Sequence, residues 1–96
     1  MPPDTTGAKH TFLLGRTCAT QGAATSLSAD DILLALKRHA SCDWGDLEIG
    51  DKARNERALA RGDRLFSVYT SACGIRFYVV TEWDRSVTTV LLPHEY

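Results

Sequence analysis

The strongest pattern of apolar and polar positions lies in the last third of the chain. Three runs there are rich in Val, Ile, Tyr, Phe and Thr, which favour extended backbone, and they span residues 64–70, 75–80 and 87–92. The segments between them, 71–74 and 81–86, are turn-like, and Pro93 ends the last run because proline removes a backbone donor. The pattern predicts a three-stranded antiparallel meander.

A helical pattern precedes the meander over residues 29–41. Ser28 and Asp31 form the sequence signature of a capping box, and Leu27 stands where it can pack onto the first turns of a helix. Apolar residues and one histidine then recur at helical spacing: Ile32, Leu33, Leu36, His39 and Ala40. We therefore expect an amphipathic helix whose apolar stripe includes His39.

The remaining segments complete the expected architecture. Residues 51–61 favour a shallow surface helix that ends at Gly62, residues 11–18 favour a strand, and residues 20–26 resemble a linker with room for one helical turn. We expect residues 1–9 to form a flexible tail and residues 10–96 to form a single domain, since 96 residues suffice for one core. The predicted class is α+β: an antiparallel sheet of about four strands in β-α-α-β-β-β order, with its helices packed on one face.

Composition and charge narrow the classes of partner. The 11 basic and 12 acidic residues give a net charge of −1, which makes nucleic acid an unexpected main partner, because phosphate neutralisation supplies much of such binding. No apolar run approaches the roughly 18 residues of a membrane span, and the N-terminus lacks the pattern of a signal peptide. The three cysteines show no metal-ligand spacing. The expectation is a cytoplasmic protein with no metal, cofactor or membrane partner.

Two short polar segments that contain tryptophan are candidate binding loops. In residues 43–46, Asp-Trp-Gly-Asp follows the end of the predicted helix, and residues 82–85 read Glu-Trp-Asp-Arg in a strand connection. Each has a structural alternative, since a large aromatic after a helix usually closes a core and the second segment suits a polar turn better than a metal site. The predicted contact residues are Trp44, Asp46, Trp83, Asp84 and Arg85.

A catalytic alternative assembles His39, Arg76 and Thr88 into a site of the small-ribonuclease type. Histidine would act as general base, arginine would bind the phosphate, and threonine would position it. Because His39 falls on the apolar stripe, a hydrogen-bonded core histidine is the favoured interpretation. A further alternative is a nucleic-acid-binding accessory protein that uses the stripe Arg54, Arg57 and Arg61, although a solvated helix face is the favoured interpretation of this stripe.

Three segments resemble a known family. Residues 39–46 (HASCDWGD), 64–69 (RLFSVY) and 80–96 (VTEWDRSVTTVLLPHEY) are similar to small proteins labelled plasmid-related or hypothetical, which occur on bacterial plasmids and integrative elements. The resemblance covers residues 12–96. Trp83 departs from the family by replacing a usual small residue, and it adds an aromatic group that could anchor an interface.

The resemblance implies a mobile-element setting, where small accessory proteins commonly inhibit host defence or act as toxins or regulators. Together with the absence of the usual enzyme signatures, it suggests a non-enzymatic inhibitor. The expected partner is a subunit of a host defence complex, as for an anti-CRISPR or anti-restriction protein, and the expected mode is steric occlusion.

Overall fold

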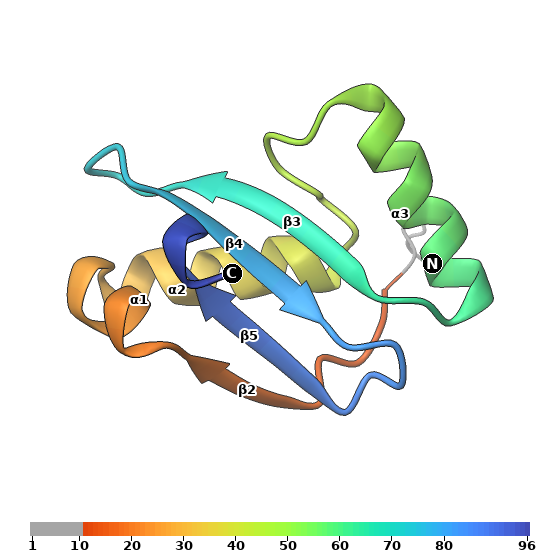
Figure 1. The fold of residues 1–96 in the computed structure, drawn as a ribbon, viewed down its shortest axis with the longest axis horizontal. Helices are drawn as coiled ribbons and strands as arrows, with labels where there is room; N and C mark the ends of the chain where they lie inside the picture. Colours follow the sequence, from red (N-terminus) through yellow and green to blue (C-terminus); the bar gives the residue numbers. More distant parts are fainter. Residues whose placement is uncertain (1–10) are drawn as a thin grey trace, which may run out of the picture.

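In the computed structural model, which describes residues 11–96, four strands form one mixed sheet in the order β2-β5-β4-β3 (Figure 1). The strands are β2 (Arg16–Ala19), β3 (Leu65–Thr70), β4 (Arg76–Thr81) and β5 (Val87–Leu91). The predicted tail, residues 1–9, lies outside the described residues. The predicted meander is confirmed, since β3, β4 and β5 pair antiparallel in chain order.

The helices are α1 (Gln21–Ser26), α2 (Ala29–Ala40), α3 (Ile49–Arg61) and a 3₁₀ turn, η1 (Pro93–Glu95). The α+β class is confirmed, with the order β-α-α-α-β-β-β. The additional helix α1 forms where a linker was expected, because Thr20 caps it by accepting a hydrogen bond from the Ala23 amide at 3.2 Å.

The first strand pairs differently from the prediction. β2 lies parallel to β5 at the edge of the sheet, with the Arg16 amide bonded to the Ser86 carbonyl and the Thr20 amide bonded to the Val90 carbonyl. Parallel neighbours require a long crossover connection, and here the whole stretch from α1 to β4 lies between the two strands. A pattern of apolar residues within one strand carries no information about the direction of its neighbour.

Helix α2 begins as the sequence predicts, but its capping box is only half formed. The Ser28 hydroxyl accepts from the Asp31 amide at 3.0 Å. The Asp31 carboxylate accepts instead from the Ala72 amide at 3.3 Å, in the turn between β3 and β4. This bond attaches the start of the helix to the sheet.

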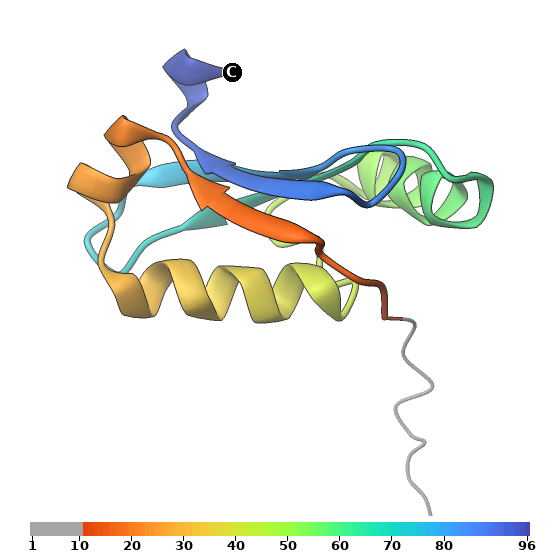
Figure 2. The ribbon, with the colours of Figure 1, turned by 90° about the horizontal axis from the view of Figure 1, so that it is seen from below.

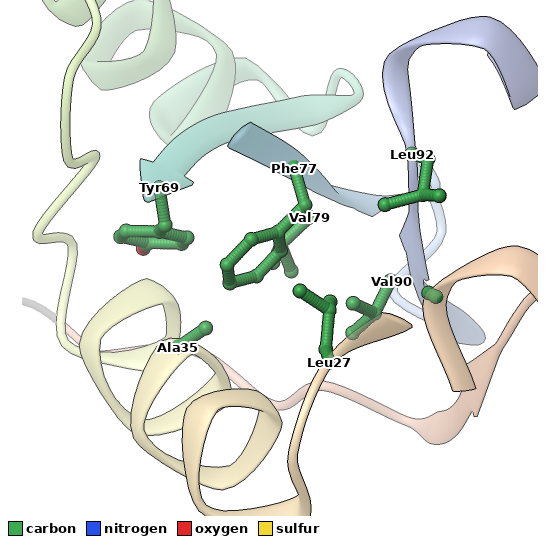
Figure 3. Close-up of a cluster of buried hydrophobic side chains, with 8 residues drawn as sticks. Leu27, Ala35, Tyr69, Phe77, Val79, Val90 and Leu92 are labelled. Carbon is green, nitrogen blue, oxygen red and sulfur yellow. The ribbon is translucent and has the colours of Figure 1, made fainter. Parts of the chain in front are cut away.

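The main core lies between one face of the sheet and α1 and α2 (Figure 3). Its buried members are Ala23, Leu27, Ala35, Tyr69, Phe77, Val79, Val90 and Leu92. Figure 2 shows α2 on this side of the sheet and η1 on the other. The prediction that helices cover one face therefore holds for α2, while η1 is the helical element that the described residues place on the opposite face.

A second, smaller core holds α3 against the other edge strand, β3. Trp44, Ala58 and Leu65 are buried there, and Phe12 and Leu47 pack on them. Gly62 ends the helix with φ of 80°, a left-handed conformation that glycine adopts without steric cost. This confirms the predicted end of the helix.

Candidate protein-binding surface

The 43–46 segment covers the outer edge of β3. The Asp46 amide donates to the Val68 carbonyl at 2.7 Å, and the Val68 amide donates to the Trp44 carbonyl at 3.3 Å. Gly45 forms an isolated parallel bridge to Val68 with φ of 74°, and a Cβ there would clash with the Val68 carbonyl oxygen. The segment therefore acts as a short extra strand.

Trp44 is part of the core rather than of the surface. Its side chain is 3% exposed, and its indole N–H donates to the Glu56 carboxylate at 2.7 Å. The ring stacks on Phe12 with centroids 6.1 Å apart and meets His39 edge-on at 5.7 Å. Of the two interpretations of this loop, the structure favours the one in which a large aromatic closes a core.

Asn55 completes the cover on the same edge. Its amide nitrogen donates to the Phe66 carbonyl at 2.6 Å, and its amide oxygen accepts from the Phe66 N–H at 3.2 Å. One side chain thus satisfies both outward-facing backbone groups of a strand residue, as a neighbouring strand would. This role of Asn55 could not be predicted from the sequence, because nothing in a helical polar position signals a partner 11 residues away.

His39 lies at the centre of a buried polar chain. Its Nδ1 is 2.6 Å from the Ser67 hydroxyl, and its Nε2 is 2.9 Å from the Thr81 hydroxyl. Thr81 contacts the Thr88 hydroxyl at 2.6 Å, and Thr88 donates to the Leu14 carbonyl at 2.7 Å. The chain joins α2 to three strands and to the segment before β2.

The direction of these bonds follows from the last acceptor. A carbonyl only accepts, so Thr88 donates to Leu14 and must accept from Thr81. Thr81 then accepts the Nε2 proton of His39, and Nδ1 accepts from Ser67. The imidazole is neutral in this arrangement, and burial, reinforced by the charge of Arg85, lowers the pKa of His39 to about 3.

The residues of the ribonuclease alternative are only partly brought together. His39 and Thr88 are fully buried and linked through Thr81. Arg76 is exposed at the opposite end of β4 from Thr81, a separation of about 17 Å along the strand. The hydrogen-bonded core histidine, the favoured interpretation, is what the structure shows.

Arg85 is a structural clamp in the turn between β4 and β5. Its guanidinium donates to the carbonyl of Asp63 at 2.6 Å, to that of Ala58 at 3.3 Å, and to those of Glu82 and Trp83. The first two carbonyls belong to the end of α3 and the residues after it, so the clamp fastens that helix to the meander. Its backbone is left-handed, with φ of 60°.

The other predicted contact residues remain at the surface. Trp83 is 66% exposed at the tip of the same turn. Asp84 accepts from the Ser86 hydroxyl at 2.6 Å, and this bond is the main reason that its pKa is lowered. Asp46 accepts from the Thr70 hydroxyl at 3.0 Å. Within residues 11–96, no group of three or more His, Cys, Asp or Glu side chains is placed to hold a metal ion.

The sheet face opposite α2 carries an aromatic cluster that no motif in the sequence signals, because its members come from separate segments. The Phe66 and Tyr78 rings lie 4.7 Å apart, and Tyr96 contacts them at 5.5 and 5.7 Å. Arg64 places its guanidinium 5.9 Å from the Tyr96 ring and donates to its hydroxyl at 3.3 Å. We call Phe66, Tyr78, Tyr96 and Arg64 the aromatic face.

The aromatic face borders a hollow of about 410 Å³. The hollow is lined by Arg64, Val80, Glu82, Thr89, Leu91, Glu95 and Tyr96. Arg64 and Glu82 form an ion pair at 3.6 Å on its rim. The lining thus combines apolar and charged side chains, and Glu82 leads directly into the turn that exposes Trp83.

The arginine stripe lies beside this surface. Arg54, Arg57 and Arg61 are exposed on α3, and together with Arg64 they line a second hollow of about 380 Å³. Arg54 is 3.5 Å from Asp51, so one of these charges is partly compensated. Because Arg64 belongs to both hollows, the basic stripe and the aromatic face are adjacent.

Comparison with known proteins assigns no relative: the chain matches no family model, no curated protein and no solved structure. Among the described residues, no helix is long and apolar enough to cross a membrane.

Proposed function

We propose that this chain is a binding protein encoded by a mobile element, that it acts without catalysis, and that it blocks a bacterial defence complex by occlusion. The contact surface in this proposal is the aromatic face together with Trp83. The observation that carries it is the aromatic face itself, with exposed Tyr96 and Arg64 on a side of the sheet that none of the long helices among residues 11–96 covers, together with the exposed Trp83 in the turn after β4.

The chemistry of this surface suits a protein partner. Tyrosine, tryptophan and arginine are the residues most enriched at the energetic centres of protein interfaces. Tyr96 is 63% exposed and Trp83 66% exposed, so both keep most of their contact area available. A standard interface covers about 800 Å² on each partner, which a face of three strands can supply. The adjacent arginines favour a partner with an acidic surface.

The class of partner is supported by the resemblance rather than by the geometry. Small proteins of mobile elements commonly act against restriction or CRISPR–Cas systems, and these systems are large complexes whose function depends on open subunit and nucleic-acid surfaces. A rigid domain of this size that binds at such a surface inhibits by occupying it.

The test measures protection of a targeted phage. The chain is expressed in hosts that carry a defined CRISPR–Cas or restriction system, and we expect the efficiency of plaquing to rise. The double variant Tyr96→Ala with Trp83→Ala should abolish protection, while Ile49→Ala, which truncates a residue that is 85% exposed on α3, should retain it. Lack of protection in every host, together with no binding to the purified complexes, would remove the proposal.

Nucleic acid is the second candidate, because bases can stack on exposed aromatic rings and the neighbouring arginines can bind the phosphates of a single strand. The two candidates differ in the dependence of binding on salt. Nucleic-acid binding should weaken steeply between 50 and 200 mM salt and lose slope in Arg57→Ala. If the purified protein still binds oligonucleotides at physiological salt, the result would favour this second candidate over a protein partner.

A further inference from the structure

The outer edge of β2 exposes backbone groups that have no partner among residues 11–96. In a parallel ladder, alternate residues of a strand bond to the neighbouring strand. The Arg16 and Thr20 amides bond to β5, and this shows which alternate residues of β2 face that strand. Arg16, Cys18 and Thr20 direct their backbone groups toward β5. Thr17 and Ala19 therefore direct their N–H and C=O groups away from the sheet.

Between Arg16 and Thr20, this edge carries no charged residue, proline or bulge that would discourage pairing. Natural edges commonly carry lysine, proline, a bulge or a covering segment. On β3 the cover is present, formed by Asn55 and the 43–46 segment. On β2 the residues Thr17, Cys18 and Ala19 are uncharged and exposed.

We propose that β2 pairs with β2 of a second copy of this chain, antiparallel about a two-fold axis that passes beside Cys18. Thr17 then lies opposite Ala19 of the other copy, and four backbone hydrogen bonds form across the axis. When the two-fold axis passes beside Cys18, both outward-facing residues of each copy, Thr17 and Ala19, form backbone hydrogen bonds with the other copy. The two sheets become one continuous sheet of eight strands.

On the helix side, the pairing closes an apolar groove that a single copy leaves open. The groove holds about 230 Å³ and is lined by Thr17, Cys18, Ala19, Ile32, Leu33, Leu36 and Val90. Leu33 is 60% exposed in this groove, although it belongs to the apolar stripe of α2, which the sequence pattern predicts to be buried. A second copy brings its own Thr17, Ala19 and Leu33 to this groove, which explains why the outer wall is apolar.

On the opposite side, the charges are complementary across the same axis. The register that centres on Cys18 places Arg16 opposite Thr20 of the other copy. The Thr20 hydroxyl donates to the Glu95 carboxylate at 2.5 Å, and Gly22 donates to the same carboxylate at 3.0 Å. Each Arg16 therefore meets a fixed carboxylate of the other copy, and the axis repeats this pair. This complementarity selects a second copy of the chain as the occupant of the edge.

The dimer has a geometric consequence for the molecule. Continuous strands carry both aromatic faces on the same side of the eight-stranded sheet, and both α2 helices on the other. This arrangement does not depend on the proposed function, since any partner would meet a surface with two-fold symmetry.

The first experiment measures the mass of the full chain by sedimentation equilibrium. We expect twice the 10.6 kDa of one copy at micromolar concentration.

Variants at the edge test the pairing. Thr17→Pro removes an outward N–H that β5 does not use, and it should weaken dimerisation at least tenfold. Thr17→Val keeps that N–H and should leave the dimerisation constant within twofold of the wild type. Arg16→Glu should weaken dimerisation as well, and Arg76→Glu, at an exposed position on β4, should not. The proposal would be overturned if the wild-type chain stayed monomeric at every concentration up to roughly 1 mM, which corresponds to weak association.

The second experiment uses the native thiols. A non-hydrogen-bonded antiparallel pair places its Cα atoms about 4.5 Å apart, within the range of a disulfide. The oxidant diamide takes two electrons and two protons from two Cys18 thiols and becomes a hydrazine, and the sulfurs join. We expect a covalent dimer that is absent in Cys18→Ser and present in Cys73→Ser, whose thiol is also exposed in the wild type. Cross-linking that Cys18→Ser does not reduce would contradict the Cys18-centred register.

Discussion

The two edges of the sheet are finished in opposite ways. At β3, Asn55 and the 43–46 segment satisfy the outward backbone groups of Phe66 and Val68, and Trp44 anchors the cover in a core of its own. At β2, the outward groups of Thr17 and Ala19 have no partner among the described residues. An edge can be closed within one chain when a long connection passes beside it, and an edge left open by the chain is the one available to another molecule.

The largest expected effect is on the closed edge. Trp44→Ala removes the anchor of the cover, leaves the Glu56 carboxylate without its indole donor, and opens a cavity beside His39 and Phe12. We expect the free energy of unfolding to fall by about 3–5 kcal/mol. Urea denaturation followed by circular dichroism measures it, with Trp83→Ala as the matched change of an exposed tryptophan. Equal losses in the two variants would show that the cover is not anchored by Trp44.

Next in size is the loss of the side chain that imitates a strand. Asn55→Leu keeps the branched shape of a side chain whose residue is 5% exposed but leaves both backbone groups of Phe66 unpaired. We expect a loss of about 2–4 kcal/mol in the free energy of unfolding, since each orphaned buried group costs about 1–2 kcal/mol. Hydrogen exchange at the Phe66 amide should accelerate more than exchange at Val79. Unchanged protection of Phe66 would place its partner elsewhere.

The polar chain beneath the closed edge predicts a dependence on pH. His39 has a folded pKa of about 3 and an unfolded value of 6.5, so the unfolded state binds the additional proton between these values. The contribution of His39 to the free energy of unfolding is therefore complete above pH 6.5. It falls by about 1.4 kcal/mol per pH unit as the pH drops from 6.5 toward 3.

Urea denaturation at pH 7, 6, 5 and 4 measures this dependence of the free energy of unfolding on pH. Proton NMR then tests whether His39 is the group responsible. The imidazole resonances of His39 should not shift between pH 7 and 5, because its folded pKa lies well below this range. Titration of His39 near pH 6.5 in the folded protein would show that the imidazole is not enclosed.

The smallest expected effect is at the open edge. Thr17→Val changes an exposed side chain and keeps every backbone group. We expect the free energy of unfolding to change by less than about 0.5 kcal/mol. Measured beside Asn55→Leu, this variant separates an edge that the chain itself completes from one that it does not. A loss as large as that of Asn55→Leu would abolish the contrast.

Elements with strong local signals were predictable. The meander, the start of α2 at Ser28 and the end of α3 at Gly62 agree with the structure, because turn residues, caps and periodicity act over a few positions. The binding surface was harder. Of the predicted contact residues, Trp83, Asp84 and Asp46 lie at the surface, whereas Trp44 is buried and Arg85 is occupied by backbone carbonyls.

The sequence by itself therefore determined the α+β class, the antiparallel meander, the start of α2 and the end of α3. Only the tertiary structure decided that β2 runs parallel to β5, that Asn55 serves as a strand partner, and that Phe66, Tyr78 and Tyr96 meet on one face. The physical reason is distance along the chain. Helix caps and strand alternation depend on neighbouring residues, whereas edge cover and surface clusters depend on pairings between segments that the chain brings together only on folding.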